Sequence, residues 1–89
     1  MLMCETTYKH ILDLFLTRQI DVKIFIDQYF AQWESDRDNA VSFDPKFERM
    51  IGRIFTSCDC YSEDPENPYE ISEEQLRLEI DLLRYIWWG

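Results

Sequence analysis

Basic residues are scarce in this 89-residue chain: nine Lys and Arg stand against eighteen Asp and Glu, a formal net charge of −9. Proteins that bind the phosphates of DNA or RNA independently of sequence need clustered Lys and Arg. Anionic membrane surfaces also attract basic segments. The shortage of basic residues therefore argues against direct nucleic-acid binding and against binding to an anionic membrane.

Glycine and proline are also rare, with two and three residues, and no glycine-rich loop that would cradle a phosphate is present. Apolar residues nonetheless make up 46% of the chain and aromatic residues 16%. Disordered chains combine high net charge with few apolar and aromatic side chains, which is not the case here. We therefore predict that the chain folds, as a single helical domain over residues 1–89.

Long apolar runs are absent as well. No stretch approaches the roughly 18–20 apolar residues that span a bilayer, and residues 1–8 lack the basic and apolar regions of a secretory signal. The three cysteines are an odd number, whereas small secreted domains typically carry an even disulfide framework. These features predict free thiols and a cytoplasmic location.

The residue types that build catalytic and metal sites are sparse. His10 is the only histidine, so a catalytic triad lacks its parts. Cys58 and Cys60 form a C-x-C pair with no second ligand pair, unlike the C-x-x-C pairs of zinc sites. The acids after Cys58 do not follow the calcium-loop pattern. We predict no enzyme activity, no cofactor and no metal; a small enzyme, or a zinc or redox switch at the two cysteines, remain alternatives.

Apolar spacing predicts four helices joined by short connections, over residues 6–18, 22–36, 45–58 and 73–87. Asp21, Asp44 before Pro45, and a capping box from Ser72 to Gln75 mark three of the starts. Four helices with short joints predict an all-α, antiparallel four-helix bundle. The residues expected to face inward include Tyr8, Ile11, Leu12, Phe15, Val22, Phe25, Ile26, Tyr29, Phe30, Trp33, Phe47, Met50, Ile51, Ile54, Cys58, Leu76, Ile80, Leu83 and Trp87.

Two features of these helices need an explanation. Gly52 lies inside the third helix, where glycine costs about 1 kcal/mol relative to alanine. We interpret it as the mark of a close helix–helix approach. The run from Tyr85 to Trp88 is unusually aromatic; it either completes the core or forms an interface, and the sequence leaves both open.

The acidic excess is concentrated in one part of the chain. Residues 1–58 hold nine acids and seven bases, whereas residues 59–89 hold nine acids and two bases. All nine of these later acids lie between Asp59 and Asp81, which we name the acidic segment. It is either a solvated region that keeps the bundle soluble or a docking surface for a basic partner. Tyr61 and Tyr69 lie among the acids and favour docking, since tyrosine is enriched at interface hot spots.

The chain also resembles a known family. The stretch Asp13-Leu-Phe-Leu-Thr-Arg-Gln-Ile20, followed by Phe25, Tyr29 and Trp33, resembles the opening helix pair of the colicin D-type immunity proteins. The later run is more specific. It is similar to that family's passage from the third helix through an acidic loop into the fourth, and consists of Ile54-Phe-Thr-Ser-Cys-Asp-Cys-Tyr61, Asp64-Pro65, Tyr69-Glu-Ile71 and Glu74-Gln-Leu-Arg77.

The resemblance implies a cytoplasmic four-helix immunity protein that binds the nuclease domain of a cognate toxin. In that family the toxin is a tRNA-cleaving enzyme, whose basic active site is covered by carboxylates that imitate phosphates. Related modules protect against contact-dependent growth-inhibition toxins. Asp59, Tyr61 and Asp64 match the family's toxin-binding positions.

We predict a 1:1 complex with the toxin domain. The predicted toxin-binding residues are Asp59, Tyr61, Glu63, Asp64, Glu66, Tyr69 and Glu70, of which Glu63, Glu66 and Glu70 are included on charge alone. The alternative is an acidic adaptor, or nucleic-acid mimic, for an unrelated basic protein.

Overall fold

Four helices make up most of the computed structural model, which describes residues 2–89 and their side chains from residue 5 onward. In chain order they are α1 (Leu2–Leu16), α2 (Val22–Asp38), α3 (Pro45–Cys60) and α4 (Glu73–Trp88). Residues 2–89 contain no strand, only an isolated bridge between residues 61 and 71. The predicted all-α class is confirmed and is compatible with a four-helix bundle, whereas the antiparallel order of the helices stays a prediction.

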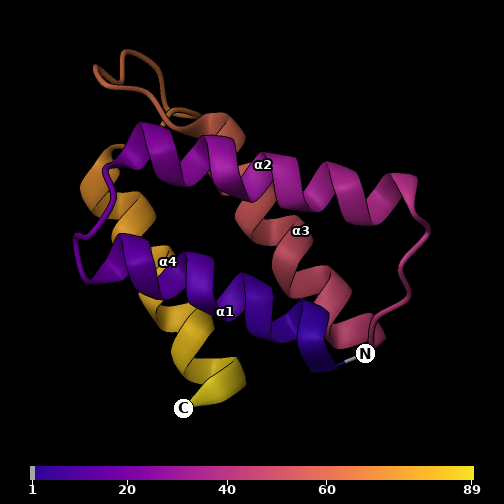
Figure 1. Cartoon of the computed structure of the whole chain (residues 1–89). Coiled ribbons are helices and arrows are strands. Elements are labelled where there is room, and N and C mark those ends of the chain that lie inside the picture. Colours follow the sequence, from indigo (N-terminus) through magenta and orange to yellow (C-terminus); the bar gives the residue numbers. More distant parts are fainter. Residues whose placement is uncertain (1) are drawn as a thin grey trace.

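The helices surround one aromatic-rich core. The main contacts join α1 to α2 and α4, and α3 to α2 and α4 (Figure 1). The rings of Phe15 and Phe25 stack at 4.3 Å between centroids, and the Tyr29 hydroxyl donates to the Ile51 carbonyl at 2.7 Å. None of the described helices is both long and apolar enough to cross a membrane. The side chains with no exposed surface are Tyr8, Leu12, Phe15, Phe25, Tyr29, Phe47, Ile54, Leu76 and Ile80.

The predicted starts of α2, α3 and α4 are confirmed, and each has the predicted cap. The Asp21 carboxylate accepts a hydrogen bond from the N–H three residues later, at 2.9 Å, and Asp44 accepts from the N–H two residues later, at 2.8 Å. The Ser72 hydroxyl accepts from the Gln75 N–H at 3.2 Å, while the Gln75 side chain accepts from the Ser72 N–H at 2.9 Å. These side chains satisfy backbone donors that have no partner within the helix.

Several helix ends differ from the prediction. Helix α1 begins at Leu2 instead of residue 6, and α2 and α3 each continue two residues further, to Asp38 and Cys60. After α1 and α2 the chain turns through a residue with positive φ, Arg18 at 62° and Ala40 at 52°. In both places the following N–H bonds the carbonyl five residues earlier at 2.9 Å. This is the Schellman arrangement, which ends a helix through its backbone.

The interpretation of Gly52 is wrong. A Cβ built on this residue meets no atom within 4 Å outside its own helix turn, so no neighbouring helix approaches closely there. The glycine in α3 therefore has no packing reason in this structure.

The aromatic C-terminus is divided between the core and the surface. The Trp87 and Trp88 rings pack against Phe47, with centroids 5.2 and 5.9 Å apart. The Trp87 indole N–H donates to Glu5 at 3.2 Å. Tyr85 remains exposed, as does the residue that follows it. The two tryptophans thus extend the core.

Candidate functional site

The acidic segment begins at Asp59 in the last turn of α3 and continues into a loop, residues 61–71, that leads to α4. The two ends of the loop are held together by backbone hydrogen bonds. The Ser62 N–H donates to the Ile71 carbonyl, and the Ile71 N–H donates to the Cys60 carbonyl, both at 3.0 Å. Figure 1 shows the loop projecting beyond the helices at one end of the molecule. Much of the charge therefore lies on a closed loop at that end.

Glu70 stabilises this loop from within. Its carboxylate accepts hydrogen bonds from the backbone N–H groups of Glu66 and Asn67 at 3.1 and 3.3 Å, and from the Asn67 side-chain amide at 2.8 Å. These donors, the Glu66 N–H above all, lower the pKa of Glu70. The Asn67 side-chain oxygen in turn accepts from the Tyr69 N–H at 3.0 Å. Glu70 is a predicted site residue, and the loop's own backbone occupies its carboxylate.

A second support comes from α2. Lys23 Nζ lies 2.9 Å from a Glu63 carboxylate oxygen, in an ion pair whose side chains are both exposed. Tyr61 is half-buried and packs against the core. Burial raises the pKa of Tyr61, and the nearby Glu63 charge adds to the increase. The loop is thus attached to the core through Tyr61 and to α2 through Glu63.

The other predicted site residues face solvent. Asp59, Asp64 and Glu66 are exposed, and the Tyr69 side chain is 83% exposed. Hydrogen bonds within the loop involve the backbone N–H groups of Asp64 and Glu66. Their carboxylates, and that of Asp59, have no hydrogen-bond or ion-pair partner among the described residues. These three carboxylates and the Tyr69 ring are accessible to another molecule.

The family model for bacterial self-protective colicin-like immunity matches residues 3–83. The chain belongs to this family. No curated protein and no solved structure matches the chain. The family indicates a toxin-neutralising immunity protein, which binds a cognate toxin and is in general not catalytic. The resemblance to colicin-type immunity proteins is confirmed at this level, and the toxin contacts of individual residues stay predictions.

The cysteines and the histidine of the immunity protein were considered as catalytic or metal-binding residues. Burial raises the pKa of the Cys58 thiol to about 12, so this predicted core cysteine is protonated near neutral pH. Cys60 is half-buried and His10 is exposed. Among the residues that the structure describes, no three His, Cys, Asp or Glu side chains are grouped to hold a metal ion.

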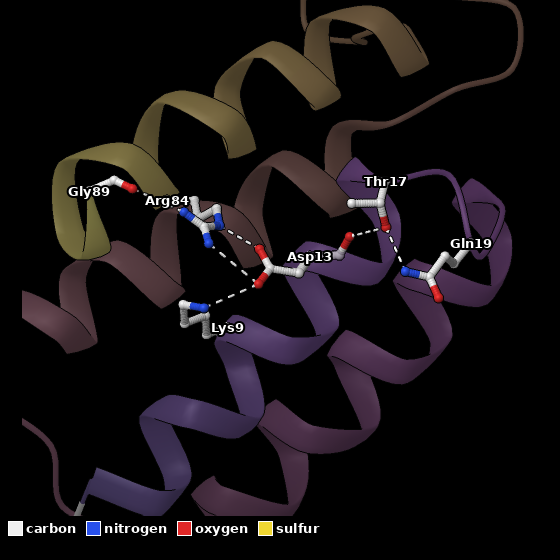
Figure 2. Close-up of polar contacts among 6 residues, drawn as sticks. All are labelled: Lys9, Asp13, Thr17, Gln19, Arg84 and Gly89. Carbon is white, nitrogen blue, oxygen red and sulfur yellow. Dashed lines mark hydrogen bonds and ion pairs between the residues drawn. The ribbon is translucent and has the colours of Figure 1, made fainter.

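A separate polar cluster joins α1 to α4 in the immunity protein (Figure 2). The Asp13 carboxylate accepts hydrogen bonds from the Arg84 guanidinium, and from Lys9 Nζ at 3.3 Å. Arg84 also donates to the Gly89 carbonyl at 3.2 Å. The Arg84 hydrogen bond lowers the pKa of Asp13, and Asp13 raises the pKa of Arg84. The cluster fastens the C-terminal half of α4 to α1.

Sequence reasoning missed two parts of this surface. Lys23 supports the loop through Glu63, and no local pattern in the sequence links residues so far apart. The second part is a row of four exposed apolar residues of α4: the sequence leaves the last two open between core and interface, whereas the first two were missed, although the spacing of four, seven and eight residues is visible in the sequence. They are Leu78, Leu82, Tyr85 and Ile86.

Proposed function

We propose that this immunity protein neutralises a bacterial RNase toxin, a tRNase, by covering the basic active site of the toxin domain with its acidic loop. The proposal is supported by a difference among the carboxylates of the acidic segment: some are bound within the protein, and others are exposed without a partner among the described residues. Glu70 and Glu63 are engaged in hydrogen bonds or an ion pair. Asp59, Asp64 and Glu66 are exposed. The contacts of Glu70 and Glu63 hold the loop in place, and the other carboxylates give its surface a negative charge.

Electrostatics favours this partner. An enzyme that cleaves RNA holds substrate phosphates with Lys and Arg. Carboxylates at corresponding positions pair with the same side chains and exclude the substrate. Concentrated charge of one sign also speeds the encounter with an oppositely charged protein. A loop that is already ordered loses less conformational entropy on binding.

The residues have distinct roles in the proposed complex. Asp59 and Asp64 pair with toxin Lys or Arg side chains, and Glu66 adds charge beside them. Tyr69 packs between the charged pairs, and Tyr61 supports the loop from the core side. The complex is 1:1, forms in the cytoplasm of the producing bacterium, and needs neither catalysis nor a cofactor. Contact-dependent growth-inhibition tRNases belong to the class of toxins that such a protein would inhibit.

The proposal predicts that a toxin gene lies directly upstream of the gene for this chain, and the test uses the C-terminal domain of that toxin. Asp59→Ala and Asp64→Ala should each raise the Kd by about tenfold or more, because desolvated charge pairs couple by roughly 1.5–7 kcal/mol. Calorimetry or biolayer interferometry measures the affinity, and a tRNA cleavage assay measures inhibition. Thermal unfolding should be nearly unchanged, since both side chains are exposed.

Glu34→Ala is the matched control. It removes one exposed carboxylate from the second half of α2, outside the acidic segment, and should leave the Kd unchanged. Full protection of tRNA by both aspartate variants would overturn the phosphate-mimicry mechanism. Absence of binding by the wild-type protein would overturn the proposed partner altogether.

A further inference from the structure

Helix α4 carries a second apolar face. Leu78, Leu82, Tyr85 and Ile86 are 71%, 58%, 70% and 67% exposed. Spacings of four, seven and eight residues place these side chains on one side of a helix. The opposite side carries Leu76 and Ile80, which are buried in the core. The exposed side chains therefore form a stripe along the outer surface of α4, which we name the α4 stripe.

The α4 stripe gathers most of the exposed apolar surface. Six large apolar side chains are exposed among the described residues, and five of them lie within residues 69–86. The sixth, Ile24, is on α2. Single exposed apolar residues are ordinary, whereas contiguous patches mark interaction surfaces. Tyr69 belongs to the loop that leads directly into α4 (Figure 1), so the stripe follows the acidic loop along the chain.

Charges beside the α4 stripe are mainly acidic. Glu74 lies one turn before Leu78, and Asp81 lies within one turn of both Leu78 and Tyr85; both acids are exposed. Arg18 borders a hollow beside Leu78.

Two further arginines near the stripe already have acidic partners. Arg77 Nε lies 2.8 Å from Glu73, and Arg53 Nε lies 2.6 Å from Glu79. On balance, the charge left at the border of the α4 stripe is negative.

The negative charge at the border of the α4 stripe distinguishes between two possible partners, a second copy of this chain and a basic protein. A second copy of the chain would carry the same acidic border and a net charge of −9, and like charges brought together across an interface oppose association. A partner with apolar side chains bordered by Lys and Arg complements the stripe. The toxin domain proposed as partner of the acidic loop supplies the basic part of that chemistry.

We propose that the α4 stripe is a second docking surface for the same toxin domain, beside the acidic loop. This inference rests on the proposed function and extends it. Leu82 and Tyr85 act as apolar anchors that slow dissociation, whereas the loop carboxylates speed association and set the register. The toxin domain therefore carries an apolar ridge next to its basic active site.

The experiment compares a double variant, Leu82→Ala with Tyr85→Ala, with wild type and with the control Ile24→Ala. The control removes an exposed apolar side chain from α2, which packs against α1 and α3. Binding is measured by surface plasmon resonance to the upstream-encoded toxin domain, inactivated by mutation. The double variant should bind at least about tenfold more weakly through faster dissociation, with an unchanged salt dependence of association and an unchanged melting temperature.

The outcomes separate the two proposals. If the double variant binds like wild type while Asp59→Ala binds weakly, the α4 docking surface is wrong and the proposed function stands. If wild type does not bind the toxin domain, both are wrong. If wild type sediments as a dimer and the double variant as a monomer, the stripe is a self-association surface, which overturns the inference.

Discussion

At the scale of the residue, the carboxylates of the loop differ in their contacts, although the sequence does not distinguish them. Glu70 accepts hydrogen bonds from the N–H groups of Glu66 and Asn67, and Glu63 pairs with Lys23. Asp64 is exposed, and its carboxylate makes neither a hydrogen bond nor an ion pair with the described residues. Charge count alone therefore overstates the number of acids that a partner can use. The exposed acids without a partner among the described residues are the better candidates for recognition.

Gly52 gives a prediction at the same scale. Gly52→Ala should raise the free energy of unfolding by about 1 kcal/mol, because alanine favours the helix and the added methyl group meets no neighbour. For a domain of this size that corresponds to an increase in melting temperature of about 4–8 °C. Urea unfolding followed by circular dichroism measures the change. A lower stability would mean that another chain segment does approach this position.

At the scale of the element, the three helix starts that carry a side-chain cap were predictable, whereas the start of α1 and the exact ends of the helices were not. Side chains such as Asp21, Asp44 and Ser72 cap a helix through contacts two or three residues away, so a local pattern reveals them. Helices α1 and α2 instead end through the backbone at Arg18 and Ala40, two residue types without a left-handed preference. No side-chain signal marks such an end.

A glycine at the left-handed position after α2 should stabilise the protein. Ala40→Gly should raise the free energy of unfolding by about 1 kcal/mol, since a left-handed conformation costs a non-glycine residue about 1–2 kcal/mol. The matched control is Ala31→Gly, the same chemical change in the interior of α2, which should lower stability by about 1 kcal/mol. Guanidinium unfolding of both variants measures the two effects. Equal destabilisation at the two positions would contradict the left-handed geometry at Ala40.

At the scale of the whole molecule, charge is distributed unequally between a nearly neutral body and an acidic segment. The location of that segment was predictable because it follows from counting residues. The support by Lys23 and Glu70 was not, since it depends on how the loop folds and on a partner from α2. The α4 stripe was predictable in spacing, but its exposure depended on which face of α4 meets the core.

The link between Asp13 and Arg84 gives a prediction for the whole fold. Arg84→Met should lower the free energy of unfolding at pH 7 by about 0.5–1 kcal/mol, because the pair is partly exposed and screened. Arg84 lowers the pKa of Asp13 in the folded state. The stability that the pair contributes is therefore present above the unfolded pKa of Asp, about 4, and is lost as the pH falls through the lower folded value.

Urea unfolding at pH 7 and at pH 2–3 measures this dependence, and the difference between Arg84→Met and wild type should shrink in acid. Arg37→Met is the control, because Arg37 pairs with the neighbouring Asp38 on the surface and does not join two helices. Its effect should stay within about 0.5 kcal/mol at either pH. A difference for Arg84→Met that is constant with pH would assign its role to packing.

The hydrogen bonds that join the two ends of the loop determine which of its positions can change without disturbing the fold. Cys60, Ser62 and Ile71 are held to one another by backbone groups, which any residue type except proline supplies. Substitutions between those anchor points leave the helices undisturbed, as long as the internal contacts of Glu70 are kept. In the proposed complex, a lineage of such proteins would therefore follow a changing toxin by altering a few solvent-facing positions, while the helices beneath them stay the same.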